Sequence, residues 1–278
     1  MSKQTMIIVP HPDDETLAFS HIIMNEVAAG NPLKIVVVTT GDEGGADQYG
    51  DEIPRLRMAE ILRAMEIFGI PKEDLIILGY GDKLTLTNAF EDTENPDKCY
   101  PSGQRYQYRE TYGFPEAGCN DFRFVQSGYH HPYTRNAILK DIIEVISLYH
   151  PTDIFTVSEC DIHRDHRATY RFVTEALHRI QQDDKTYRPN FYISLVHFDK
   201  DLWPYDDASH FPDPFKGLDQ KPFDWDSRIQ FLMTDEMKEK KKRAIGEFTT
   251  QLAYSREYLE KFNKEDEFYV KELIHLAE

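Results

Sequence analysis

The sequence lacks long hydrophobic runs. No uninterrupted apolar stretch approaches the ~20 residues that a membrane-spanning helix needs. The five-residue apolar stretch near the N-terminus is shorter than the ~7 to 15 residues of a signal-peptide core. We therefore expect a soluble, cytoplasmic protein that is made without export and has no membrane partner.

Cysteine is scarce as well. Cys99, Cys119 and Cys160 are the three cysteines of the chain, and no C-x-x-C pair occurs. An odd number without that spacing argues against a disulfide framework and against a thiolate zinc site. We expect reduced thiols, so any bound metal must be held by nitrogen and oxygen ligands.

Positive charge is also low. The 32 lysines and arginines are outnumbered by 49 acidic residues, which gives a net charge of −17. Such a surface repels the phosphates of nucleic acids and the headgroups of anionic lipids. We therefore expect no nucleic-acid partner and a small-molecule substrate instead. The charge does not decide whether the protein forms a homo-oligomer.

Apolar material is sufficient for a core, since 40% of the 278 residues are hydrophobic. Strand-like and helix-like segments alternate, as in βαβ folds. They predict a Rossmann-like three-layer α/β sandwich in one domain, 1–278, with a mostly parallel sheet in strand order 3-2-1-4-5 plus extra strands. The predicted strands are 6–9, 33–39, 75–78, 153–157, 191–198 and 229–233, and the predicted helices are 15–29, 54–68, 134–149, 167–181 and 234–263.

Periodicity fails after the third strand, where residues 83–133 predict a long inserted lid or rim. Its tyrosines either stack against a sugar or pack the insertion onto its own domain. His130 and His131 are expected to be a surface pair, and 199–226 a surface loop. The tyrosines in question are Tyr100, Tyr106, Tyr108, Tyr112 and Tyr129.

The sharpest local feature is PHPDDE at 10–15, between the first strand and the first helix. Its three carboxylates repel one another at neutral pH unless a cation or hydrogen-bond donors offset their charge. Acids beside a histidine also form a nitrogen and oxygen ligand set. The plain alternative is a helix N-terminus, which favours acids near its positive end.

A second cluster, HRDH at 163–166, follows the fourth strand. Two histidines three residues apart share one face of a helix, but two surface histidines would give the same pattern. In a sheet ordered 3-2-1-4-5, strands 1 and 4 are neighbours, and their carboxyl ends form the crevice where ligands bind. The two clusters therefore predict one metal site.

Together these motifs resemble the LmbE-like and PIG-L-like zinc deacetylases, which act on N-acetylglucosamine-containing substrates. The segments TTGDEGG at 39–45, RMAEILRAMEIFGI at 57–70 and LGYGD at 78–82 support the likeness, which spans most of the first two thirds of the chain. The resemblance implies that Zn²⁺ is bound by His11, Asp14 and His166, although another divalent transition metal would suit the same ligands.

The resemblance also implies catalytic roles. Asp13 would be the general base for the attacking water, and His163, held charged and oriented by Asp165, would stabilise the tetrahedral intermediate. Substrate-binding residues are expected at Arg57, Asp82 and Glu43. A salt bridge with Glu60 or the acidic loop is the alternative for Arg57, and a turn is the alternative for Asp82.

The chain departs from the family near its C-terminus. Many members carry an Ala-x-x-x-His-x-Ser-Gln-like stretch, whereas AIGEFTTQ at 244–251 keeps Gln251 and has Phe248 where a histidine is expected. This difference weakens any role for that region.

We therefore expect a zinc-dependent hydrolase of a linear amide, which removes the N-acetyl group from an N-acetylglucosamine-containing substrate. One alternative is an amidase of a larger glucosamine conjugate, because the same chemistry serves any amide that the pocket admits. Another is a metal-dependent sugar-binding protein without turnover. A nucleotide-binding Rossmann protein is disfavoured, since no glycine-rich phosphate loop follows the first strand.

Overall fold

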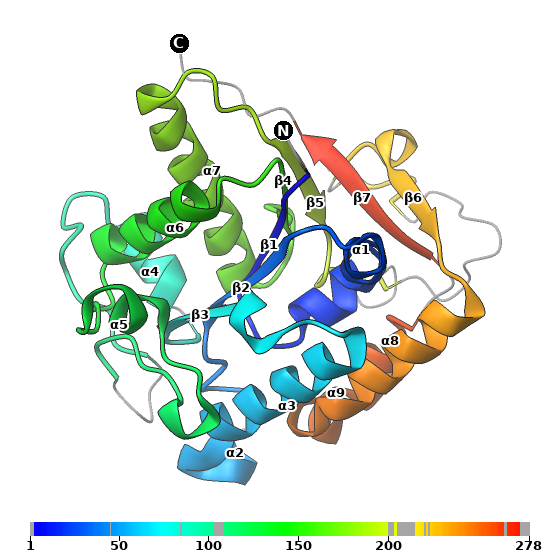
Figure 1. Ribbon diagram of the computed structural model, residues 1–278, viewed down its shortest axis with the longest axis horizontal. Coiled ribbons are helices and arrows are strands. Elements are labelled where there is room, and N and C mark those ends of the chain that lie inside the picture. The colour runs from blue at the N-terminus through cyan, green and yellow to red at the C-terminus, as the bar shows by residue number, and fades with distance from the viewer. Residues whose placement is uncertain are drawn as a thin grey trace.

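The computed structural model describes residues 3–44, 46–83, 85–102, 108–199, 203–204, 215–219, 221, 223–263 and 266–272. A seven-stranded sheet runs through the middle of the molecule (Figure 1). Its order is β3 (Leu75–Tyr80), β2 (Leu33–Thr39), β1 (Thr5–Val9), β4 (Asp153–Val157), β5 (Asn190–Ser194), β7 (Asp266–Glu272) and β6 (Ile229–Leu232).

The first five strands are parallel, which confirms the predicted order 3-2-1-4-5. β7 is antiparallel to both β5 and β6. The sequence analysis predicted β6 but missed β7, because the segment DEFYVKE carries four charged residues in seven and gives no apolar run.

Helices cover both faces of the sheet and make the predicted three layers (Figure 1). None of the helices in the described ranges is both long and apolar enough to cross a membrane. One face carries α1 (Asp14–Ala29), α3 (Ile53–Phe68), α8 (Asp235–Glu247) and α9 (Thr249–Glu260), and the other carries α4 (Thr85–Glu91), α6 (Arg135–Tyr149) and α7 (Arg164–Asp183). The short helices are α2 (Ala46–Tyr49) and α5 (Phe122–Ser127), with 3-10 turns at Gly50–Glu52, Lys72–Asp74, Pro115–Ala117 and Trp225–Ser227.

Alternation along the central strands separates two cores. In β1, Ile7 and Val9 pack with the side chains of α1 and α3, whereas Met6 and Ile8 pack with those of α6 and α7. Successive side chains of a strand point to opposite faces, so a strand buried on both faces is a continuous apolar run. This is why the strands were recognisable from sequence.

Several predicted boundaries are confirmed and three are wrong. Gly30 and Gly69 end α1 and α3 in the left-handed conformation, and Thr134 caps α6 by accepting from the Ala137 backbone N–H. However, α7 begins three residues earlier than predicted, at Arg164, and β5 ends at Ser194 rather than at 198. The predicted helix 234–263 is two helices that meet at Phe248.

The insertion after β3 contains α4 and α5, and its two histidines have carboxylate partners on α6 and within the insertion itself. His131 is buried with its Nδ1 3.0 Å from Asp141 Oδ1, so the expectation of a surface pair is wrong for this residue. His130 Nδ1 lies 2.8 Å from Asp121 Oδ2. Asp121 is nine residues from His130, and Asp141 is ten residues from His131. Neither separation is typical of a local ligand motif, so the sequence did not reveal these partners.

The predicted loop at 199–226 is described only in part, and the described residues are not all at the surface. Trp203, Phe215 and Trp225 are buried and form a small apolar cluster with Leu195. Aromatic side chains this large drive local burial even where no regular element forms.

Candidate metal centre and active site

The turn after β1 delivers the first cluster to the carboxyl edge of the sheet. Asp13 has φ 125°, in a region that non-glycine residues rarely occupy, and its carbonyl accepts from the backbone N–H groups of Thr16 and Leu17 at the start of α1. The Asp13 N–H donates to buried Glu15 at 3.0 Å. Backbone strain of this kind is concentrated at functional sites. The hydrogen bond to Glu15 helps to hold the Asp13 backbone in this conformation.

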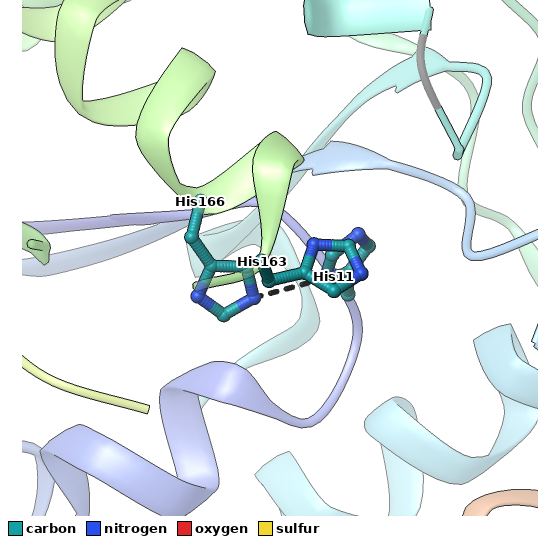
Figure 2. Close-up of side chains that lie close together, drawn as sticks. All are labelled: His11, His163 and His166. Atoms are coloured by element: carbon teal, nitrogen blue, oxygen red, sulfur yellow. Dashed lines mark hydrogen bonds between the residues drawn. The ribbon is translucent and has the colours of Figure 1, made fainter. Parts of the chain in front are cut away.

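The second cluster lies on the turn from β4 into α7. His163 is the residue before the helix and His166 lies in its first turn, so α7 presents both imidazoles toward the β1 turn (Figure 2). β1 and β4 are paired neighbours, with Ile8 opposite Thr156. The predicted convergence of the two clusters at the switch point of the sheet is what the structure shows.

Three predicted ligand atoms form a nearly equilateral triangle. His11 Nδ1 lies 3.2 Å from Asp14 Oδ2, and His166 Nε2 lies 3.3 Å from the same oxygen. The two ring nitrogens, of His11 and His166, are 3.3 Å apart, and Figure 2 marks this contact. Ligand atoms at about 2.0–2.1 Å from one tetrahedral zinc are roughly 3.3–3.4 Å from one another. The triangle therefore has the size that such an ion requires.

The surrounding charge also suits a cation. Burial alone would lower the pKa of His11, but Asp82, Asp14 and Asp165 outweigh it and raise that pKa well above its usual value. Burial likewise opposes charge on His166, and Asp14 and Asp161 raise its pKa. An environment that favours positive charge on two buried imidazoles favours a divalent cation bound between them.

The remaining ring nitrogen of each predicted ligand histidine lies against a carboxylate. His11 Nε2 is 3.1 Å from Asp82 Oδ1 and 3.6 Å from Asp165 Oδ2. His166 Nδ1 is 3.1 Å from Asp161 Oδ2. Such carboxylates fix the tautomer and orientation of metal-binding histidines, so each ring would present its other nitrogen to the ion.

This geometry corrects the expected pairing of Asp165 with His163. Asp165 Oδ2 accepts from the Lys83 backbone N–H at 2.9 Å and faces His11. The residue that holds the His163 backbone is Asp161, which accepts from its N–H at 2.8 Å. Asp161 lies outside the HRDH motif, so the motif gave it no predicted role.

His163 itself lies among the other histidines, with its ring edge-on to His11 at a centroid distance of 4.8 Å. Burial, together with His11 and His166, lowers the pKa of His163 to about 3 in this arrangement. The expected charged form is therefore not favoured here. Its Nδ1 is buried and has no hydrogen-bond partner among the described residues, so it is available to a bound molecule.

Asp13 lines the pocket beside this triangle. Burial, followed by the neighbouring charge of Asp14, raises its pKa well above the usual value for an aspartate. Burial also raises the pKa of Glu15 to about 7. A carboxylate with a raised pKa is a stronger base than an exposed one.

The pocket has a volume of about 220 Å³ and includes three residues that the sequence analysis missed. His197 follows β5, and its ring stacks on Tyr258 at 5.5 Å with an angle of 8°. Tyr254 and Tyr258 come from α9. His197 was findable, because it lies at the carboxyl end of a parallel strand, but its position was assigned to the strand itself. The lining residues are His11, Asp13, Leu17, Gly44, Arg57, Asp82, His163, His197, Gln251, Tyr254, Ser255, Tyr258 and Leu259.

Arg57 reaches this pocket from α3. It is buried, and its Nη2 donates to the Tyr254 hydroxyl at 3.2 Å. Gly41 has φ 66°, and a Cβ there would lie 2.3 Å from Arg57 Nη1, so only glycine lets the loop cover the guanidinium. Glu60 is not its salt-bridge partner, since Glu60 accepts from Thr249 and Thr250 at the start of α9.

The other predicted substrate-binding residues have different positions. Asp82 lines the pocket but contacts His11, and Glu43 is outside the lining, 3.5 Å from Lys83 Nζ. Phe248 is buried in the core, whereas Gln251 lines the pocket and, with its amide oriented to match its neighbours, bridges Arg57 and Glu60.

The tyrosines of the insertion do not form the described lining of this pocket. The Tyr112 hydroxyl is 2.6 Å from Thr40 Oγ1, so this tyrosine packs the insertion onto the protein, whereas Tyr100 donates to Asp92 within the insertion. Tyr108 and Tyr129 are exposed, and Tyr106 lies outside the described residues.

Fold and site together define an α/β protein with a cluster of nitrogen and oxygen donors that could hold a metal ion at the switch point of a parallel sheet. Comparison with known families agrees: residues 6–177 match the model of PIG-L, GlcNAc-PI de-N-acetylase. The chain belongs to the PIG-L family, and the resemblance predicted from its motifs is confirmed.

Individual curated proteins match a smaller part of the chain than the family model does. The chain is 33% identical over 99 residues to "Probable N-acetyl-alpha-D-glucosaminyl L-malate deacetylase 2" of Bacillus cereus, a match that covers 34% of this chain and 43% of that protein. It spans about two fifths of the length of the curated relatives that it matches.

Solved structures share the fold over nearly the whole chain. An N,N'-diacetylchitobiose deacetylase from Pyrococcus horikoshii is 18% identical with a TM-score of 0.58, covering 98% of this chain and 85% of that one. A 4-carboxy-2-hydroxymuconate hydratase from Pseudomonas putida is 12% identical with a TM-score of 0.52, covering 99% and 98%. These likenesses concern the fold alone, which does not decide the reaction.

Proposed function

We propose that this protein is a cytoplasmic, zinc-dependent deacetylase that hydrolyses the acetamide of an N-acetylglucosamine conjugate to a free amine and acetate. The observation that carries the proposal is Asp13. It is a buried carboxylate with a raised pKa that lines the pocket directly beside the triangle of His11, Asp14 and His166. A site that only bound a metal would have no need of it.

The substrate class is supported by the names of the matching proteins. The family model is described as GlcNAc-PI de-N-acetylase, and the Bacillus cereus relative as an N-acetylglucosaminyl malate deacetylase. Both describe removal of an acetyl group from N-acetylglucosamine that carries a further group. The pocket's aromatic and charged lining suits an amphipathic, hydroxylated ring.

His11, Asp14 and His166 would hold the ion. Two imidazoles and one carboxylate are a ligand set that zinc favours, and three protein ligands leave it an open position. When bound, zinc supplies Lewis-acid polarisation of a carbonyl and makes water acidic enough to lose a proton near neutral pH.

The protein's own groups would move the protons. Asp13 takes a proton from the attacking water, because its raised pKa makes it a competent base. Its rigid position follows from the strained turn, in which Glu15 and the start of α1 fix the Asp13 backbone. Water attack on the amide carbon then places negative charge on the carbonyl oxygen.

His163, from the HRDH motif, lines the same pocket as Asp13, from the PHPDDE motif, and would contact the reacting amide. Its unpartnered Nδ1 can exchange a hydrogen bond or a proton with the amide as the C–N bond breaks. Arg57 supplies the positive charge in the lining that is not part of the histidine cluster, and it would bind a substrate hydroxyl or carboxylate. Asp82 and Asp165 would act through His11 by fixing its orientation.

The experiment that tests this proposal compares Asp13→Asn with His166→Ala for bound zinc and for acetate release. Asp13→Asn should keep stoichiometric zinc and lose turnover, whereas His166→Ala should lose both. Asp153→Asn, at the remote end of β4, serves as the buried-carboxylate control and should change neither. Equal zinc loss in the Asp13 and His166 variants would contradict the assignment of Asp13 as base.

A further inference from the structure

The turn after β3 carries Asp82, and a side chain that follows the neighbouring strand holds this turn. β2 and β3 end side by side, with Thr39 opposite Tyr80, and the Thr40 backbone N–H donates to the Tyr80 carbonyl at 3.0 Å. Just beyond, the Asp82 backbone N–H donates at 2.7 Å to Oδ1 of Asp42, which is fully buried. Asp42 therefore supplies the acceptor that a backbone carbonyl supplies within the sheet.

Asp82 is the residue through which this hydrogen bond reaches the candidate site. Its Oδ1 lies 3.1 Å from His11 Nε2 and also accepts from the Lys83 backbone N–H at 2.6 Å. Lys83 has φ 54°, a conformation that costs free energy in a residue other than glycine, so the turn needs contacts that hold it. Because a carboxylate behind a metal-binding histidine fixes the direction of the ring, whatever holds this turn also orients His11.

The insertion packs directly on the same turn. A Cβ atom on Gly81 would lie 2.0 Å from Ser102 Cβ and 3.0 Å from the Tyr133 ring. One on Gly79 would lie 2.5 Å from the Tyr112 carbonyl oxygen. The Tyr112 backbone N–H donates to the Gly79 carbonyl at 3.2 Å. The two glycines therefore let the insertion approach the end of β3 more closely than any other residue would.

Ser102 brings a hydroxyl of the insertion to Asp42. Its side chain is fully buried, and its backbone N–H donates to the Tyr108 carbonyl at 2.9 Å, so the insertion fixes its place. Burial, followed by the charge of Asp82, raises the pKa of Asp42 to about 7, and the nearby Ser102 hydroxyl opposes this rise. Among the described residues, Asp42 Oδ2 and Ser102 Oγ have no other hydrogen-bond partner. Since buried polar groups are normally hydrogen-bonded, each is the available partner of the other.

The buried tyrosine hydroxyls of the insertion near Asp42 have other partners. The Tyr112 hydroxyl is 2.6 Å from Thr40 Oγ1, and the Tyr133 hydroxyl donates to the Gly79 carbonyl at 3.3 Å. Within the described part of the insertion, the hydroxyl left for Asp42 is therefore that of Ser102.

We infer that Asp42 and Ser102 are positioning residues of the proposed metal centre: Ser102 holds Asp42, and Asp42 holds the turn from which Asp82 orients His11. The inference rests on the proposed function only in taking His11 as a metal ligand. It gives the insertion a role as a support behind the site rather than as a lid over it.

The test measures zinc affinity by competition with a chromophoric chelator at fixed pH, and the visible spectrum of the protein loaded with Co²⁺, whose bands report ligand geometry. Asp42→Ala removes the acceptor for the Asp82 N–H. It should shift the cobalt bands and raise the zinc dissociation constant about tenfold, the lower end of the effect of losing a carboxylate behind a metal-binding histidine. Asp42→Asn keeps an acceptor oxygen, and its amide can donate to the serine oxygen, so affinity and spectrum should stay close to those of the parent.

Ser102→Ala is the milder variant and keeps the test decisive if Asp42→Ala fails to fold. It should shift the cobalt bands in the same direction and raise the zinc dissociation constant about two- to threefold, the scale of one hydrogen bond. Two controls should change neither readout. Asp153→Ala removes a buried carboxylate at the remote end of β4, and Thr111→Ala removes a buried hydroxyl of the insertion that donates to Asp121 at 2.8 Å.

Thermal unfolding without metal shows which variants keep the fold. Parent-like affinity and spectrum in folded Asp42→Ala would overturn the inference, and so would an equal loss in Asp42→Asn, because the acceptor would then not matter. Parent-like behaviour of Ser102→Ala, or an equal loss in Thr111→Ala, would overturn the role of the insertion.

Acetate release separates this inference from the proposed function. If the parent releases no acetate from N-acetylglucosamine conjugates but the zinc and cobalt differences are found, the deacetylase proposal fails and the positioning role stands. If acetate is released and the differences are absent, the positioning role alone fails. If the parent neither binds zinc nor releases acetate, both fail.

Discussion

Asp161→Asn is the substitution that most sharply tests how the proposed metal site is held. Asp161 is fully buried, and its Oδ2 lies 3.1 Å from His166 Nδ1. The same carboxylate accepts from the backbone N–H groups of His163 at 2.8 Å, His197 at 2.7 Å and Val196 at 3.2 Å. One side chain therefore fixes His166, a proposed metal ligand, and the two loops that carry His163 and His197.

The size of the effect follows from these contacts. Asparagine keeps the shape but removes the negative charge beside His166 and replaces one acceptor oxygen with a donor. Loss of a carboxylate behind a metal-binding histidine typically lowers metal affinity about 10- to 100-fold. We expect a zinc dissociation constant raised by that factor, which corresponds to about 1.4–2.7 kcal/mol of binding free energy.

The assay is competition for zinc against a chromophoric chelator at fixed pH. Asp153→Asn is the matched control, because Asp153 is a buried carboxylate at the start of β4, the strand that precedes Asp161, and it accepts from Asn190 at 3.0 Å, far from the site. Thermal unfolding of both variants without metal shows whether the fold is intact. A zinc affinity in Asp161→Asn equal to that of the parent, with the fold intact, would refute the reasoning.

Three further predictions follow from the described contacts. Arg57→Lys, which loses the planar fork that reaches Tyr254, should lower kcat/KM about tenfold in steady-state assays while zinc content is unchanged; unchanged kcat/KM would remove Arg57 from substrate binding. Gly41→Ala should lower the free energy of unfolding in urea by about 1–3 kcal/mol, because of its positive φ and the clash with Arg57, whereas Gly246→Ala, in open space on α8, should not lower it. Phe172→Ala should cost about 3–5 kcal/mol in the same titration, since this ring is fully buried, and exposed Leu148→Ala should cost far less.

The parts of the fold that the sequence predicted are those with strong local signals. β1 and β2 are continuous apolar runs, and α1 and α3 end at glycines in the left-handed conformation. β7 has no such signal, since its place in the sheet depends on pairing with β5 and β6. The break at Phe248 is also a tertiary effect, because Glu60 of α3 holds the start of α9.

The candidate site shows the same division. His11, Asp14 and His166 were recognisable because each belongs to a short motif at a strand end. Asp161 and Tyr258 were not, because their roles depend on contacts between segments that are distant in sequence, and His197 was assigned to the strand that precedes it. The pairing of Asp165 was misassigned for a related reason: adjacency to His163 in sequence does not decide which histidine a carboxylate faces in space.

The proposed function is hydrolysis of an acetamide at this site with the help of a bound metal ion. The most direct measurement is the simultaneous quantification of acetate and free amine released by the zinc-loaded protein from N-acetylglucosamine conjugates, before and after removal of the metal by a chelator. We expect equal amounts of both products, loss of both on chelation, and recovery when zinc is restored. Absence of acetate from every conjugate, with zinc bound stoichiometrically, would contradict it, and release of a larger acid would instead indicate an amidase of another conjugate.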